Sequence, residues 1–84
     1  MNTYRTTFVS ACPINGDRIE YQLAIEALTT IPVEAIALET DTITTGKPML
    51  HEDIADTLYA KLGGKQVIEA QHRQVHISTL RGGA

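Results

Sequence analysis

Hydrophobic and polar residues alternate over one stretch near the start of the chain, from Ile19 to Ala27. One side of this stretch carries Ile19, Tyr21, Leu23, Ile25 and Ala27, and the other carries Glu20, Gln22, Ala24 and Glu26. A period of two is typical of a strand that is buried on one face. The residues from Thr6 to Ala11 are mostly β-branched or small, and Asn15-Gly16-Asp17 between the two stretches is typical of a hairpin turn. We therefore expect an antiparallel hairpin with Cys12 at the end of its first strand.

Two helices are expected in the middle of the chain. The first spans Pro32 to Glu39, where Pro occupies the first turn, and the threonine-rich segment from Thr40 to Thr45 is expected to end it in a loop. The second spans Glu52 to Leu62, with acidic residues in its first turn and Gly63-Gly64 just beyond its end. Its hydrophobic residues lie on one stripe: Ile54, Leu58, Tyr59 and Leu62.

Two more strands are expected at the end of the chain, from Gln66 to Gln71 and from Gln74 to Leu80, joined by a reversal near His72-Arg73. Gly82-Gly83 is interpreted as a frayed tail. The order is β-β-α-α-β-β, which predicts an α+β fold with both helices on one face of an antiparallel sheet.

Composition places the chain among small soluble proteins. Its 84 residues are expected to form one domain spanning residues 1–84, and a domain of this size buries so little surface that self-association is expected. The net charge of −3 provides no general attraction to nucleic acid, and the seven basic residues form no run. No apolar run reaches the roughly 20 residues that span a membrane, and no secretory signal is indicated. With one cysteine, the reducing cytoplasm is the expected location.

Cys12 is the first candidate for chemistry, since a single thiol cannot form an internal disulfide. A reactive cysteine needs a neighbouring base or cation, and the candidates are Asp17, His51, His72 and His76. A turn through Asn15-Gly16 would bring Asp17 back toward the sulfur. The alternative is that Cys12 is a small apolar residue of the core.

His51-Glu52-Asp53 is the second candidate, because it begins the second expected helix, where side chains can approach a ligand. The alternative is that His51 caps the helix and that the two acids complement the helix dipole. No metal site is expected, since one Cys and three His occur without a recognised ligand spacing.

Together these segments resemble the nitrile reductase family that acts on 7-cyano-7-deazaguanine. The resemblance rests on Ser10-Ala11-Cys12-Pro13-Ile14-Asn15-Gly16-Asp17, Val33-Glu34, His51-Glu52-Asp53 and a final hairpin that ends in Arg81-Gly82-Gly83. That family belongs to the tunnelling-fold superfamily, with GTP cyclohydrolase I and dihydroneopterin aldolase. The resemblance implies that this chain is one unit of an oligomeric barrel.

The resemblance also implies roles for five residues. Cys12 would add to the nitrile to give a covalent thioimide, and Asp17 would donate a proton, although the family usually has its Asp two residues further from the Cys. His51 would pack beside the substrate ring, Glu52 would accept its guanine-like N–H groups, and Glu34 would match an acidic position of the substrate site.

The cofactor motif of the reductases is absent. They carry a Glu-Ser-Lys-Ser-Leu-Lys-like segment whose lysines meet the NADPH phosphate, and here the corresponding segment is Glu34-Ala35-Ile36-Ala37-Leu38-Glu39. Both lysines are missing, which favours the reductase-like amidinotransferases that form archaeosine. In such a branch ammonia would attack the thioimide of a 7-deazaguanine nitrile carried in tRNA or DNA, and no redox cofactor would be needed.

Two alternatives remain. One keeps NADPH-dependent reduction or a pterin-like chemistry, because Val67 to His72 also resembles a strand of GTP cyclohydrolase I. The other is a non-catalytic oligomer that binds a purine or pterin, in which Cys12 only packs. A buried Cys12 with no cleft beside it would favour this second alternative. In the superfamily, sites lie between subunits, so we expect residues of two chains to meet at each site and the exposed sheet edges to be covered.

Overall fold

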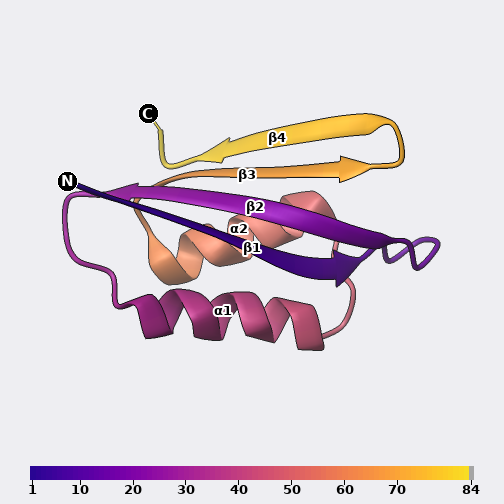
Figure 1. Ribbon diagram of the computed structural model, residues 1–84, viewed down its shortest axis with the longest axis horizontal. Helices are drawn as coiled ribbons and strands as arrows, with labels where there is room; N and C mark the ends of the chain where they lie inside the picture. The colour runs from indigo at the N-terminus through magenta and orange to yellow at the C-terminus, as the bar shows by residue number, and fades with distance from the viewer. Residues whose placement is uncertain (84) are drawn as a thin grey trace.

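The computed structural model describes residues 1–83, which form an antiparallel sheet of four strands with two helices against one face (Figure 1). The elements are β1 (Asn2–Ala11), β2 (Arg18–Ala27), α1 (Val33–Thr45), α2 (His51–Leu62), β3 (Lys65–His72) and β4 (Val75–Arg81). The strands lie in chain order, β1-β2-β3-β4. This arrangement confirms the predicted α+β fold and its β-β-α-α-β-β order.

The alternating residues of β2 lie at the centre of the core. The row from Ile19 to Ala27 faces the helices and is buried, as the period of two predicts. Tyr21 lies opposite Phe8 of β1 and Ala70 of β3, and the Phe8 and Tyr21 rings stack with their centroids 5.1 Å apart. The largest completely buried side chains join sheet and helices in one core: Tyr21, Ile25, Ile54, Leu58 and Ile68.

Helix α1 is longer than the sequence predicts. It continues through the threonine-rich segment to Thr45, so the expectation that it ends at Glu39 was wrong. Its buried residues are Ile36, Thr40 and Ile43, a helical spacing that continues past the expected end. The hydroxyls of four threonines donate to backbone carbonyls of the preceding turn: Thr40 to Ile36, Thr42 to Leu38, Thr44 to Thr40 and Thr45 to Asp41. Packing of this stripe therefore overrides the low helix propensity of threonine.

Strand β1 also begins earlier than expected, at Asn2 instead of Thr6. Its first residues, Asn2 to Arg5, pair with Ala27 to Ala24 of β2. This part of β1 is mostly polar and only Tyr4 packs against the core, so its place in the sheet depends largely on pairing with the well-patterned β2.

The glycines after β4 are packed, and the interpretation as a frayed tail was wrong for Gly82. Its φ is 75°, a conformation that favours glycine. A Cβ at Gly82 would overlap the carbonyl oxygen of Gly64 and the ring of Tyr59. The end of β4 is therefore held against the α2–β3 connection.

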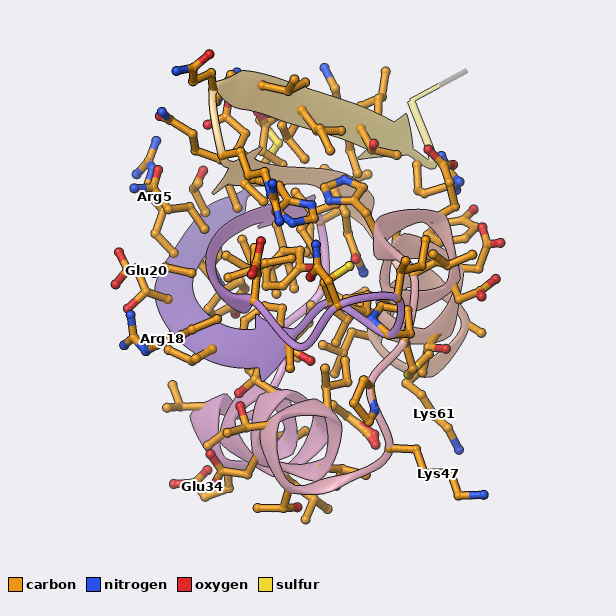
Figure 2. The ribbon with its side chains drawn as sticks, turned by 90° about the vertical axis from the view of Figure 1, so that its right-hand side faces the viewer. Arg5, Arg18, Glu20, Glu34, Lys47 and Lys61 are labelled. Carbon is orange, nitrogen blue, oxygen red and sulfur yellow. The ribbon has the colours of Figure 1, made fainter. Side chains whose placement is uncertain are left out.

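The sheet face opposite the helices is uncovered within the chain. Arg5, Arg18 and Glu20 project from it, as Figure 2 shows from the end of the molecule that carries the β1–β2 turn. A depression of about 500 Å³ lies on this face between β1, β2 and β3. Strands β1 and β4 are the two edges of the sheet. Within residues 1–83, neither helix is long and apolar enough to cross a membrane.

Candidate functional site at the Cys12 end of the sheet

The turn after β1 is closed by backbone hydrogen bonds between Cys12 and the residues that follow it. The Cys12 N–H donates to the Asp17 carbonyl and the Gly16 N–H donates to the Cys12 carbonyl, both at 2.8 Å. The Asp17 N–H donates to Oδ1 of Asn15 at 3.0 Å, and Gly16 adopts a φ of 78°. Asn15 and Gly16 thus form the predicted hairpin turn, for the reasons these residue types favour it.

Cys12 and Asp17 are cross-strand neighbours. The register pairs Ser10 with Ile19 and Ala11 with Arg18, and the next opposed positions are Cys12 and Asp17, which the backbone bond above joins. Directly opposed residues present their side chains on the same face, with Cβ atoms about 4.5–5.5 Å apart. The backbones of Cys12 and Asp17 are therefore adjacent across the turn. Cys12 itself is buried, with 7% of its surface exposed.

The Asp17 carboxylate makes its contacts with the β3–β4 turn. Its Oδ2 accepts from Nε2 of His72 at 3.2 Å and from Nε of Arg73 at 3.0 Å. The hydrogen bonds from Arg73 and His72 hold the pKa of Asp17 below its usual value. No hydrogen bond joins the Asp17 side chain to Cys12 among residues 1–83, so Asp17 as proton donor stays a prediction.

His51 begins helix α2 and lies over the core ring of Tyr21. The two ring centroids are 5.6 Å apart and the planes meet at 35°, and Nε2 of His51 is 2.8 Å from the Thr79 hydroxyl. Nδ1 is buried and has no hydrogen-bond partner among the described residues. Burial lowers the pKa of His51, which favours the neutral ring. The alternative that His51 caps the helix was wrong, because the cap position is Leu50 and no side chain caps it.

Tyr21 connects the Cys12 and His51 parts of the site. Burial raises the pKa of its phenol, and the nearby Cys12 sulfur raises it further. The sequence pattern identifies Tyr21 only as one member of the buried row of β2. Nothing in the alternation distinguishes a core tyrosine from one that borders a site.

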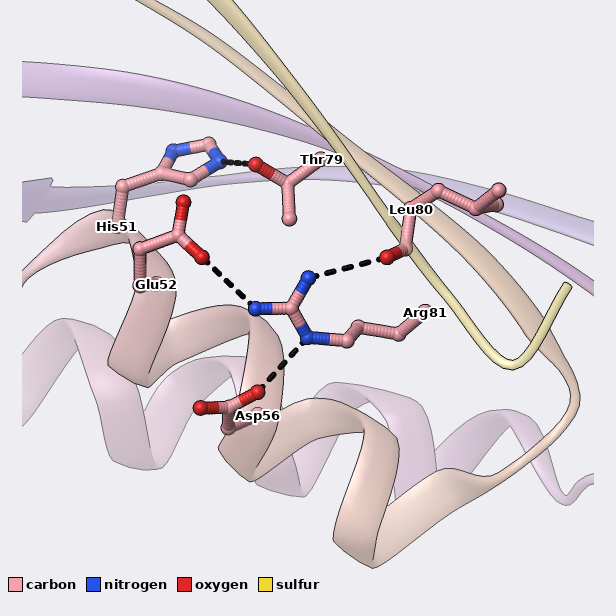
Figure 3. Close-up of polar contacts among 6 residues, drawn as sticks. All are labelled: His51, Glu52, Asp56, Thr79, Leu80 and Arg81. Atoms are coloured by element: carbon pink, nitrogen blue, oxygen red, sulfur yellow. Dashed lines mark hydrogen bonds and ion pairs between the residues drawn. The ribbon is translucent and has the colours of Figure 1, made fainter.

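Glu52 lies in the first turn of α2 and is held by Arg81 at the end of β4 (Figure 3). Nη2 of Arg81 donates to Oε2 of Glu52 at 2.8 Å, Nε donates to Oδ1 of Asp56 at 2.7 Å, and Nη1 donates to the Leu80 carbonyl at 3.0 Å. The carboxylates of Asp56 and Glu52 raise the pKa of Arg81. A guanidinium held at three points places the Glu52 carboxylate beside His51.

Glu34 is the one predicted site residue that lies far from Cys12 in the same chain. It is exposed in the first turn of α1, and its side chain projects away from the sheet (Figure 2). The start of α1 lies near Tyr4, whose hydroxyl accepts from the Ile31 N–H at 3.0 Å. Tyr4 and Cys12 are separated by about 26 Å along β1 at the usual rise of a strand. Glu34 can therefore share a site with Cys12 only if the two come from different chains.

No group of three or more His, Cys, Asp or Glu side chains within residues 1–83 is arranged to hold a metal ion. The three cavities described for the chain are lined by other residues than Cys12 and His51.

Comparison with known proteins supports the fold. No protein-family profile and no curated protein matches the sequence. A solved structure, an archaeosine synthase described as QueF-Like in the apo form, superposes with a TM-score of 0.69 at 20% sequence identity. The superposition covers 99% of this chain and 94% of the other. The chain therefore has the tunnelling fold that the resemblance implied.

Proposed function

We propose that this protein is a nitrile-modifying enzyme that forms a thioimide between Cys12 and a 7-cyano-7-deazaguanine base and releases it by amination. The observation that carries the proposal is the pairing of Cys12 with Asp17 at the end of the sheet, beside His51 and Tyr21. A thiol that attacks a nitrile needs a group that moves its proton to the nitrogen, and Asp17 occupies the opposed position. The structural likeness to an archaeosine synthase supports the same chemistry.

His51 and Glu52 are suited, by their side chains and their positions, to bind a purine-like ring. A neutral His51 ring offers a flat surface, and the Glu52 carboxylate can accept two adjacent N–H donors of a guanine-like edge. Arg81 occupies only Oε2 of Glu52. This leaves acceptor capacity on the carboxylate for a substrate.

Amination is favoured over reduction because the first half of α1 lacks basic side chains. The segment from Glu34 to Glu39 carries no basic residue, and the exposed positions near its start include Val33, Glu34 and Leu38. Such a surface has no cation for a dinucleotide phosphate. Ammonia needs no phosphate site, and the amidine forms without a redox cofactor.

The complete site would lie between two copies of the chain. Glu34 of one copy would reach the Cys12 end of another, in an assembly that also covers the edges of β1 and β4. The substrate carrier would be tRNA or DNA, and the protein would act in a reducing cytoplasm that keeps Cys12 as a thiol, without a membrane.

A second candidate function is a non-catalytic, oligomeric purine- or pterin-binding protein. The burial of Cys12 favours this candidate, and none of the three cavities described above is lined by Cys12. The two candidates differ in one respect that can be measured, since only the enzyme forms a covalent bond at Cys12.

The test is incubation with 7-cyano-7-deazaguanine, and with tRNA that carries this base, followed by intact-protein mass spectrometry. We expect an adduct on the wild-type protein that is absent in Cys12→Ala. Ser10→Ala, a buried position on the same face and two residues before Cys12, serves as the matched control and should retain the adduct. Absence of an adduct with both substrates would overturn the thioimide proposal.

A further inference from the structure

His72 is brought to Asp17 from the far end of the sequence. It ends β3, and extension of the β2–β3 register by two residues places it opposite Ile19, on the helix-covered face that also carries Cys12 and Asp17. The His72 side chain is 26% exposed and the Asp17 side chain 37%. The β1–β2 and β3–β4 turns are thus joined beside the thiol by an imidazole–carboxylate contact.

Both contacts of the Asp17 carboxylate reach the same oxygen. His72 and Arg73 bond to Oδ2, and Oδ1 has no hydrogen-bond partner among residues 1–83. One oxygen is therefore held by the turn, while the other remains able to exchange a proton with a bound molecule.

The surroundings of Asp17 conflict with a simple donor role. Arg73 and His72 stabilise its anion and lower its pKa, so the carboxyl group carries no proton near neutral pH. A carboxylate can give a proton to a nitrile nitrogen only after it has received one. A guanidinium group does not give up its proton in proteins, whereas a histidine side chain is the kind that exchanges its proton near neutrality.

We propose that His72 is a positioning residue that exchanges a proton with Asp17, so that the two side chains together relay the proton that leaves Cys12. This inference rests on the proposed function. Asp17, in the β1–β2 turn, contacts His72, and Arg73 contacts the same Asp17 oxygen; the titratable thiol of Cys12 belongs to the same face of the sheet.

With this pair, each proton that leaves one reacting atom is delivered to another. When the S–H bond of Cys12 breaks, the pair takes the proton, sulfur bonds to the nitrile carbon, and the pair gives the proton to the nitrile nitrogen. In the amination, the ammonia nitrogen bonds to the same carbon, the C–S bond breaks, and one proton moves from nitrogen through the pair to the departing sulfur. The pair returns to its starting state after each step, and nothing is oxidised or reduced.

The chain supplies a matched control in His76. It lies on the following strand, on the sheet face that the helices leave uncovered, and its Nε2 is 3.9 Å from Oε1 of Glu69. His72→Gln and His76→Gln make the same chemical change at two positions of one hairpin. Arg73→Gln removes the other donor to Asp17 without removing an exchangeable histidine.

The experiment follows the rate of the Cys12 adduct with 7-cyano-7-deazaguanine between about pH 5 and pH 8, the range in which histidines titrate. We expect His72→Gln to slow adduct formation about 100-fold, as for loss of an acid–base group, and to flatten the pH profile. His76→Gln should match the wild type, and Arg73→Gln should be slower but keep the wild-type profile. Circular dichroism checks that each variant is folded.

The outcomes separate this inference from the proposed function. If the wild-type protein forms no adduct, the proposed function is wrong and this inference falls with it. If the wild type forms the adduct and His72→Gln behaves as His76→Gln, only the role of His72 is wrong. If Arg73→Gln also flattens the pH profile of adduct formation, the turn merely holds Asp17 in place and the inference is overturned. The Arg73 variant therefore tests the inference even if His72→Gln does not fold.

Discussion

Replacement of Thr79 by valine tests whether the polar contact of His51 stabilises the site. Thr79 is 9% exposed and its hydroxyl lies 2.8 Å from Nε2 of His51. Valine has nearly the same shape, so the change removes one hydrogen bond and leaves the packing in place. Because Nδ1 of His51 already has no partner among residues 1–83, neither ring nitrogen would have one in the variant.

The cost follows from what the ring loses. A buried polar group left without its partner costs about 1–3 kcal/mol, and the partial burial of His51 places this case at about 1–2 kcal/mol. For a domain of this size, that corresponds to a fall in Tm of about 4–16 °C. If the burial of an additional apolar atom were the larger effect, Thr79→Val would be more stable than the wild type. The direction of the change in stability therefore distinguishes the two effects.

Thermal unfolding followed by circular dichroism, at one protein concentration because the chain is expected to associate, measures this effect. Thr79→Ser keeps the hydroxyl, and its only expected loss is that of a methyl group, about 0.8 kcal/mol. We expect Thr79→Val to be the less stable of the two and to form the Cys12 adduct more slowly. A Thr79→Val protein at least as stable as the wild type would show that the contact between His51 and Thr79 does not stabilise the fold.

Three further predictions concern the whole fold. The free energy of unfolding should fall on acidification in two steps: below about pH 6.5, where unfolded His51 gains a proton that the folded ring resists, and again below about pH 3.8, where the Asp17 carboxylate is protonated and its bonds with Arg73 and His72 weaken. A urea titration at several pH values checks this, and stability that rises on acidification would contradict it. Gly82→Ala should destabilise the fold by more than Gly63→Ala does. Both glycines have a positive φ, but of the two only Gly82 lacks space for a Cβ. Equal urea midpoints of unfolding for the two variants would show that the end of β4 is not packed. Thr42→Ala should stabilise α1 by about 0.5 kcal/mol, since the site is exposed and alanine is the better helix former; a less helical or less stable variant would mean that the Thr42 bond to Leu38 outweighs propensity.

The fold was largely predictable because its strongest signals are local. The alternation of β2 and the apolar stripe of α2 each lie within about ten residues, and their periods follow from element geometry. The end of α1 was missed because threonine propensity argued for a loop, while the burial of Thr40 and Ile43 depends on a sheet that local patterning does not describe. Tertiary packing decided that boundary.

The site was predictable in its residue types and less so in its contacts. Cys12 and Asp17 are joined by a short turn, so their opposition could be inferred from Asn15-Gly16. The partners of Asp17 and Glu52 could not, because His72 is 55 positions from Asp17 and Arg81 is 29 positions from Glu52. Such contacts exist only once β3 and β4 are placed beside the rest of the sheet.

The most direct test of the account is the mass of the product released from 7-cyano-7-deazaguanine. The wild-type protein is supplied with the base and ammonium in one reaction, and with the base and NADPH in another, and Cys12→Ala is run beside each. We predict a product heavier than the base by the mass of ammonia, formed only with ammonium and only when Cys12 is present. A product heavier by four hydrogens, formed with NADPH, would contradict amination, and a product that survives Cys12→Ala would contradict the thioimide itself.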